Sequence, residues 1–121
     1  RFDRIVSVGM FEHVGAKHYR DYFGAIDRLL TDDGVALVHS IGRKDRGPGF
    51  DRWTQEHIFP GGYIPAVSEA LAALEETGLW LTDLEVLRLH YAETLRHWRL
   101  RAAANRPAIE AIYDARFYRM W

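Results

Sequence analysis

The fold is decided by residues 4–41, which read RIVSVGMFEHVGAKHYRDYFGAIDRLLTDDGVALVHSI. Residues 4–8 form a β-branched run closed by Gly9, which is typical of a central parallel strand whose carboxyl end opens into a loop. Residues 35–41 form a second, nearly continuous apolar run, the pattern of a strand covered on both faces. Between the runs, apolar residues recur at three- and four-residue steps and predict an amphipathic helix packed on a sheet. They are Tyr19, Tyr22, Phe23, Ile26, Leu29 and Leu30. Strand, helix and strand, with a turn at residues 31–34, make one βαβ unit.

The remainder of the chain predicts one long loop, further helices and a third strand. Residues 42–65 hold five of the ten glycines and three of the four prolines, which indicates a long functional loop. The elements expected after it are a helix over 65–78, a strand within 79–91, a helix over 93–105 and a helix from 107 onward. We therefore expect an α/β architecture with a mostly parallel sheet and flanking helices.

Composition indicates one ordinary globular domain of 121 residues, 48% hydrophobic and 27% charged. A net charge of -1 provides no global attraction to nucleic acid or to an anionic membrane. The absence of cysteine excludes disulfides, cysteine-ligated zinc and a thiol nucleophile within these residues. No apolar run approaches the roughly 20 residues that span a bilayer, so we expect a cytoplasmic protein without a transmembrane segment. The chain begins on Arg1 inside a strand and ends at Trp121 without a cap, which predicts a fragment.

Four blocks of sequence, in order, resemble the cyclopropane fatty acid synthases and related mycolic acid methyltransferases. Residues 2–15, FDRIVSVGMFEHVG, are similar to the family's fourth strand and the loop after it. The other blocks are residues 37–42, LVHSIG, similar to its fifth strand; 58–65, IFPGGYIP, similar to its IFPGG loop; and 90–98, HYAETLRHW, similar to the stretch with its active-site tyrosine. The resemblance implies a partial Rossmann-like class I methyltransferase fold without its amino-terminal half. Residues 1–121 would then be the carboxyl-terminal portion of a single catalytic domain.

The resemblance also implies a reaction and a site. Enzymes of this family use S-adenosylmethionine to add a methylene group to the cis double bond of unsaturated phospholipid acyl chains, forming a cyclopropane ring with bound bicarbonate as base. The matching bicarbonate-binding positions are Glu12, His39, the backbone amide of Ile41 and Tyr91. Glu12, His39 and Tyr91 would be the catalytic side chains. In mycolic acid enzymes the same framework methylates or hydroxylates instead, and the sequence leaves that outcome open.

The sequence also departs from the family. It lacks the glycine-rich turn that holds the nucleotide after the first strand of such folds, and it lacks the family's active-site cysteines. We expect most of the cofactor site to lie upstream, so that this piece alone binds S-adenosylmethionine poorly and is inactive. Gly9 and Met10, after the first strand, are the expected remaining cofactor contacts.

Physical reasoning places part of the implied site at one end of the sheet. Glu12 follows the first strand, whereas His39 and Ile41 end the second, and ligands of open parallel sheets bind outside the carboxyl ends of strands. A histidine inside an apolar run needs a hydrogen-bond partner, which an anion would supply. Taken singly, a histidine such as His39 is more often a satisfied core residue, a glutamate such as Glu12 is more often a helix-capping or surface group, and Tyr91 would be a core residue. The remaining histidines show no metal-ligand spacing, and we expect no metal.

The expected partner is a phospholipid acyl chain at the inner face of the membrane, to which the protein would bind peripherally. The charged loop at residues 43–52, with Trp53, could contact lipid headgroups or simply be solvated. The competing hypothesis is an inert or noncatalytic lipid-binding or association module. Because unpaired sheet edges favour association, a homodimer is expected.

Overall fold

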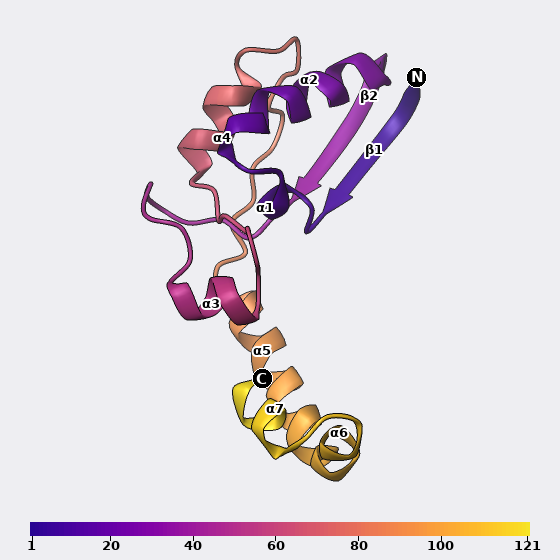
Figure 1. Cartoon of the computed structure of the whole chain (residues 1–121). Helices are drawn as coiled ribbons and strands as arrows, with labels where there is room; N and C mark the ends of the chain where they lie inside the picture. The colour runs from indigo at the N-terminus through magenta and orange to yellow at the C-terminus, as the bar shows by residue number, and fades with distance from the viewer. The chain divides into compact units, whose positions relative to one another are not determined.

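The computed structural model describes residues 1–121 and divides them into two units, 1–82 and 83–121. The first unit contains β1 (Phe2–Val8), α1 (Phe11–Val14), the short 3₁₀ helix η1 (Ala16–His18), α2 (Tyr19–Leu29), β2 (Leu30–His39), α3 (Arg52–His57) and α4 (Val67–Leu74). The second contains α5 (His90–Ala104), α6 (Arg106–Ile112) and α7 (Ala115–Met120) (Figure 1). None of these helices has both the length and the apolar character needed to cross a membrane.

The two strands form a parallel sheet, which confirms the predicted α/β class. Ile5 pairs with Ala36 and Val8 with His39, and helix α2 carries the chain back from the end of β1 to the start of β2. The predicted βαβ unit is therefore confirmed. Its geometry brings the carboxyl ends of β1 and β2 to the same edge of the sheet (Figure 1).

The predicted turn at residues 31–34 is part of β2 instead. Phe2 pairs with Leu30, but Arg4 pairs with Val35, so four residues of β2 bulge out of register. A bulge accommodates the additional residues of β2 while the strand continues on both sides of it. The prediction was wrong because the polar residues here break the hydrophobic pattern and not the strand.

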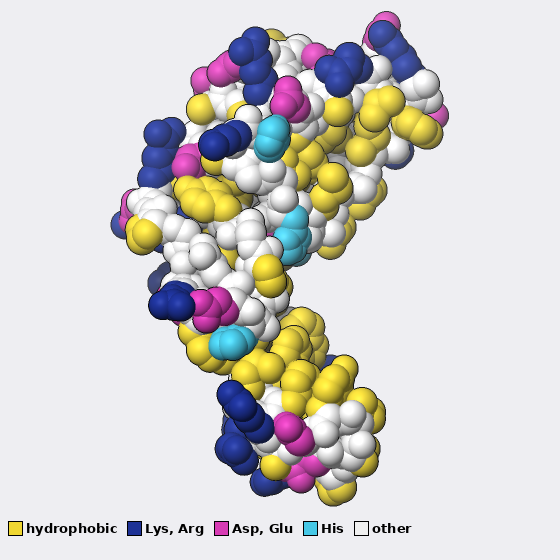
Figure 2. Space-filling view, in the orientation of Figure 1, with side chains coloured by type: hydrophobic (Ala, Val, Ile, Leu, Met, Phe, Trp, Pro, Cys, Tyr) yellow, Lys and Arg dark blue, Asp and Glu magenta, His cyan; other side chains and the backbone are white.

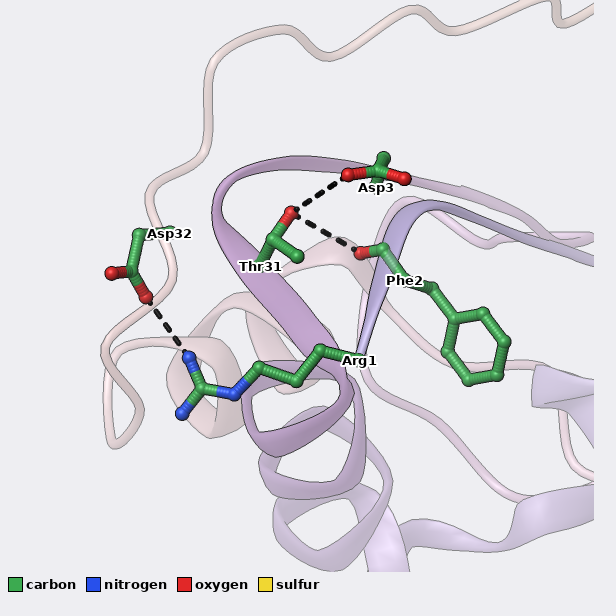
Figure 3. A network of polar contacts seen from close by, with 5 residues as sticks. All are labelled: Arg1, Phe2, Asp3, Thr31 and Asp32. Atoms are coloured by element: carbon green, nitrogen blue, oxygen red, sulfur yellow. Dashed lines mark hydrogen bonds and ion pairs between the residues drawn. The ribbon is translucent and has the colours of Figure 1, made fainter.

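Polar contacts and a glycine fit the bulge to its surroundings. Figure 3 shows the Thr31 hydroxyl 3.5 Å from the carbonyl oxygen of Phe2, and an ion pair of 3.0 Å between Arg1 and Asp32. Both contacts are exposed, so they orient the bulge and add little stability. A side chain at Gly34 would place its Cβ 2.9 Å from the carbonyl oxygen of Thr31, too close to be accommodated without movement.

The core lies on one face of the sheet, where α2 packs against β2 and against α4. Its buried members come from α1, α2 and the first residue of β2: Phe11, Tyr19, Phe23, Ile26 and Leu30. Apolar side chains of α4 pack against the same cluster. Helices α2 and α4 both lie on this face of the sheet. Side chains alternate along a strand, so every second residue of β1 and β2 points to the opposite face, which these helices do not cover.

The opposite face of the sheet is apolar and exposed. Val6 and Val8 of β1 are 69% and 64% exposed, and Val35 and Leu37 of β2 are 53% and 55% exposed. Figure 2 shows hydrophobic side chains gathered over the two strands. The prediction that the second strand is covered on both faces is therefore wrong for this chain, because no helix of the first unit packs on that side.

The predicted third strand within residues 79–91 is not formed. The stretch pairs with neither β1 nor β2, and its last two residues begin α5. Leu84, Val86 and Leu89 are 53%, 70% and 69% exposed. A strand needs a neighbouring strand for its backbone hydrogen bonds. An apolar run indicates a segment that avoids water, but it does not specify a neighbouring strand.

The predicted helices are present with different limits. The helix predicted over 65–78 is the shorter α4, which ends at Leu74. The helix predicted over 93–105 is α5 and begins earlier, at His90. The helix predicted from residue 107 onward is two helices, because Asp114 caps a new one with a 2.6 Å hydrogen bond from the backbone N–H of Phe117. The long loop contains α3, which the side chain of Asp51 caps.

Candidate active site

Glu12 lies on α1, immediately beyond the carboxyl end of β1. The chain turns into α1 at Gly9, whose φ of +65° is readily adopted only by glycine, and the Gly9 N–H donates to the carbonyl oxygen of His39 at 3.0 Å. This bond ties the ends of the two strands together. Glu12 is only 7% exposed, and its Oε1 accepts a hydrogen bond from the Ile41 N–H at 2.6 Å. The structure thus brings together two predicted site residues that are 29 positions apart.

The second carboxylate oxygen of Glu12 has no partner. Oε2 is buried and accepts no hydrogen bond from the chain. An unpaired buried carboxylate oxygen is costly, so it favours a ligand that donates a hydrogen bond. Bicarbonate carries one hydroxyl donor alongside its acceptor oxygens, so Glu12 fits the anion that the family resemblance implies.

His39 occupies a different environment from the one predicted. As the last residue of β2, it is exposed, and its ring makes no hydrogen bond within the chain. Side chains alternate along a strand, so His39 shares the open sheet face with Val35 and Leu37. We predicted that burial would oblige the His39 ring to find a hydrogen-bond partner, and this prediction was wrong because the ring is exposed. Its proposed contact with bicarbonate stays a prediction, and the open face leaves the ring free to meet a ligand.

The other predicted site residues are Gly9, Met10 and Tyr91. Gly9 has nothing within 4 Å of the place where a Cβ would lie, and Met10 is 57% exposed, so both are open to a ligand at this edge of the sheet. Tyr91 belongs to the second unit, on α5, where it is 42% exposed and its ring meets that of Trp98 edge-on. The roles of all three stay predictions. The structure gathers no three His, Asp or Glu groups that could hold a metal ion.

Sequence reasoning missed the residues that hold Glu12 in place. The backbone N–H of Tyr63 donates to the carbonyl oxygen of Glu12 at 2.9 Å. The Tyr63 hydroxyl donates to both carboxylate oxygens of Glu69, at 2.9 and 3.0 Å, and the Ala66 N–H donates to Glu69 Oε2 at 2.8 Å. The available signal was a glutamate at the third position of α4, three residues after Ala66, which is the spacing of the glutamate in a capping box.

Two tyrosines, the buried Tyr19 and the partly buried Tyr22, lie beside Phe11. The ring of Phe11 stacks on Tyr19 at 4.3 Å and meets Tyr22 at 4.9 Å, and neither tyrosine hydroxyl has a partner in the chain. Burial raises the pKa of Tyr19 to about 12, and the charge of Glu69 adds to the rise. Burial also raises the pKa of Tyr22. Both phenols therefore stay neutral near Glu12.

The raised pKa of Tyr19 predicts that the protein loses stability at alkaline pH. The unfolded side chain ionises near pH 10 and the folded one near pH 12, so stability is complete below the lower value and falls as the pH rises between them. In an absorbance titration, Tyr19→Phe should remove a phenolate that forms late and reduce this loss. Tyr113→Phe, which alters a 63% exposed side chain, is the control. If all six tyrosines titrate together near pH 10, the prediction is wrong.

The chain was also compared with known protein families and known proteins. The family described as "Mycolic acid cyclopropane synthetase" matches residues 1–121. The chain is 42% identical over 121 residues to the cyclopropane-fatty-acyl-phospholipid synthase of Escherichia coli K12, covering all of this chain and 31% of that protein. It is 34% identical over 129 residues to cyclopropane mycolic acid synthase 3 of Mycobacterium tuberculosis, covering 96% of this chain and 45% of the relative. The chain therefore spans less than half the length of either relative, 31% of the first and 45% of the second.

Solved structures give the same result. The cyclopropane synthase MmaA2 from Mycobacterium tuberculosis superimposes with a TM-score of 0.90 at 31% identity, over 99% of this chain and 47% of the other. The mycolic acid cyclopropane synthase CmaA1, solved in complex with SAH and CTAB, superimposes with a TM-score of 0.87 at 29% identity, again over 99% and 47%. These matches confirm the methyltransferase fold predicted from the four sequence blocks.

Proposed function

The chain belongs to the mycolic acid cyclopropane synthetase family, and on this premise we propose that its protein is an S-adenosylmethionine-dependent cyclopropane synthase. The proposed reaction adds a methylene group to the cis double bond of an unsaturated phospholipid acyl chain. The phospholipid is favoured as substrate because, of the two relatives described above, the enzyme named for phospholipid has the higher identity. We place the protein in the cytoplasm, bound peripherally to the inner membrane face.

The carboxylate of Glu12 carries the proposal. It is buried at the carboxyl ends of two parallel strands, where ligands of such sheets bind. One oxygen is held by the Ile41 N–H, and the other is left without a donor. A buried carboxylate with one free oxygen is suited to orienting a small hydrogen-bond donor, and this is the task that the family resemblance gives to Glu12.

The remaining roles are those that the family resemblance implies. When bound, S-adenosylmethionine supplies a transferable methyl group, and bicarbonate supplies the base for the proton lost before the ring closes. Glu12 would accept a hydrogen bond from the anion and fix its orientation, while His39 would donate to another of its oxygens. The family resemblance gives Tyr91 the same donor role. The Ile41 N–H holds Glu12 in this structure and would be shared with the anion. Gly9 and Met10 would contact the cofactor where the chain leaves β1.

His39→Ala tests the site without disturbing the fold, because the ring is exposed and makes no hydrogen bond. In the protein at its natural length, we expect kcat/KM on phospholipid vesicles to fall by roughly 10- to 100-fold, the effect of losing one hydrogen bond to an anion. The bicarbonate dependence of the rate should weaken as well. His18→Ala, which alters another exposed histidine of the first unit, should leave both unchanged. An unchanged rate and bicarbonate dependence in His39→Ala would exclude His39 from the site.

The exposed sheet face favours a second candidate, a noncatalytic association module. Val6, Val8, Val35 and Leu37 form an apolar surface, and surfaces of this kind promote association. A homodimer is consistent with either candidate and stays a prediction. Calorimetric titration with S-adenosylmethionine separates the two, since an enzyme binds the cofactor and an association module gives no binding heat.

A further inference from the structure

A short segment, residues 59–66, contacts Glu12 and also Arg43, which lies two residues beyond Ile41. We call it the clamp loop. Its Tyr63 N–H donates to the carbonyl oxygen of Glu12 at 2.9 Å. Its Pro65 carbonyl oxygen accepts from the N–H of Arg43, two residues beyond Ile41, also at 2.9 Å. The clamp loop therefore joins the segment after β1 to the segment after β2.

The clamp loop is also held by Phe59, whose N–H donates to the carbonyl oxygen of Thr54 at 2.9 Å and whose ring stacks on Phe50 at 5.6 Å. It contains Gly61, whose φ is +73°, and Gly62, and glycines loosen a backbone. No regular helix or strand forms between residues 59 and 66. Tyr63 is the residue of the clamp loop that contacts Glu12, so the contacts that fix Tyr63 and Ala66 bear on the position of Glu12.

One carboxylate fixes both residues. Glu69, in the first turn of α4, accepts the Tyr63 hydroxyl at 2.9 and 3.0 Å and the Ala66 N–H at 2.8 Å. Ala66 is fully buried. The Ala66 N–H, followed by the Tyr63 hydroxyl, lowers the pKa of Glu69, so this carboxyl stays ionised and its hydrogen bonds are charge-assisted.

We propose that Glu69 is a positioning residue for Glu12, acting through Tyr63 and the clamp loop to set the geometry of the anion site. This inference rests on the proposed function, because Glu69 touches no reacting group itself. Its carboxylate fixes the side chain of Tyr63, the backbone of Tyr63 fixes Glu12, and Glu12 meets the Ile41 amide at 2.6 Å. Loss of Glu69 should loosen bicarbonate binding and leave the cofactor contacts at Gly9 and Met10 unchanged.

The test compares graded variants in the protein at its natural length. Glu69→Ala removes every acceptor, Glu69→Gln keeps one uncharged acceptor, and Tyr63→Phe removes one hydroxyl. Isotope-labelled bicarbonate measures anion binding by NMR, and amide exchange reports the Tyr63 and Ile41 N–H groups directly. Glu76→Gln is the matched control, because Glu76 forms only an exposed ion pair with Arg20.

We expect the dissociation constant for bicarbonate to rise by roughly 10-fold or more in Glu69→Ala, the effect of losing a hydrogen bond to a charged group at a buried site. Glu69→Ala should lose more bicarbonate affinity than Glu69→Gln. The affinity of Tyr63→Phe should lie between those of the wild type and Glu69→Ala. Exchange at Tyr63 and Ile41 should accelerate in the same order. The KM for S-adenosylmethionine should stay at the wild-type value, which a general loss of structure would not allow.

Wild-type bicarbonate affinity and amide exchange in Glu69→Gln and Tyr63→Phe would overturn the proposal, and these two variants decide if Glu69→Ala does not fold. Glu12→Gln separates this failure from failure of the proposed function. If Glu12→Gln abolishes bicarbonate binding and the Glu69 and Tyr63 variants do not alter it, the positioning role of Glu69 is wrong and the proposed anion site at Glu12 is retained. If Glu12→Gln binds bicarbonate as the wild type does, the site itself is wrong and the positioning role falls with it.

Discussion

Glu12→Gln is expected to lower kcat about 10²- to 10³-fold, the range found when one preorganised catalytic group is removed. The buried carboxylate holds one oxygen at 2.6 Å from the Ile41 nitrogen and leaves the other without a partner. The amide of Gln keeps an oxygen for the Ile41 N–H, so the shape of the site persists. Its NH₂ group replaces the free acceptor with a donor, and the hydroxyl of bicarbonate then has no acceptor there.

Steady-state rates at increasing bicarbonate concentration measure this effect. The variant should retain its fold and melting temperature, because the substitution conserves volume and removes a costly unpaired oxygen. Glu56→Gln, which alters only an exposed ion pair with Arg52, is the control and should behave as wild type. A Glu12→Gln enzyme with the wild-type response to bicarbonate would contradict the assignment.

Phe11→Ala is expected to destabilise the protein by about 3–5 kcal/mol, the usual cost of deleting a buried aromatic side chain. Phe11 is 2% exposed, and its ring lies 4.3 Å from that of Tyr19 and 5.4 Å from that of Phe23. Removing it leaves a cavity at the centre of the first unit. A loss of this size is a large share of the roughly 5–15 kcal/mol that stabilises a typical domain.

Urea unfolding followed by circular dichroism measures the change in free energy. The matched control is Phe2→Ala, because Phe2 is 57% exposed and its truncation should cost far less. Equal losses in the two variants would mean that Phe11 is not at the centre of the core. Since Phe11 precedes Glu12, its loss should also lower activity at temperatures where the variant remains folded.

The local elements were predictable from sequence because their patterns are local. The β-branched run at residues 4–8 and the apolar stripe of α2 predicted the parallel βαβ unit, which the structure confirms. The rule that parallel strands end at a common edge placed Glu12 near Ile41, and the two residues are hydrogen-bonded. The sequence motifs also predicted the family before any fold comparison.

Features that depend on a partner were not predictable in this way. The apolar residues of 79–91 indicate a segment that avoids water, but pairing as a strand requires a neighbour that the run itself does not specify. His39 lies in an apolar run and was expected to be buried, yet α2 and α4 pack on the other face. The support of Glu12 by Tyr63 and Glu69 depends on long-range loop contacts, for which the sequence showed only the capping spacing at α4.

The most direct test of the central claim follows the fate of the methyl carbon. The protein at its natural length is incubated with methyl-labelled S-adenosylmethionine, bicarbonate and vesicles of phospholipid with a cis-unsaturated acyl chain, and the acyl chains are analysed by mass spectrometry. We expect label in a cyclopropane ring, dependence of the product on bicarbonate, and loss of product in Glu12→Gln. Cofactor binding without labelled lipid, or full product formation by Glu12→Gln, would contradict it.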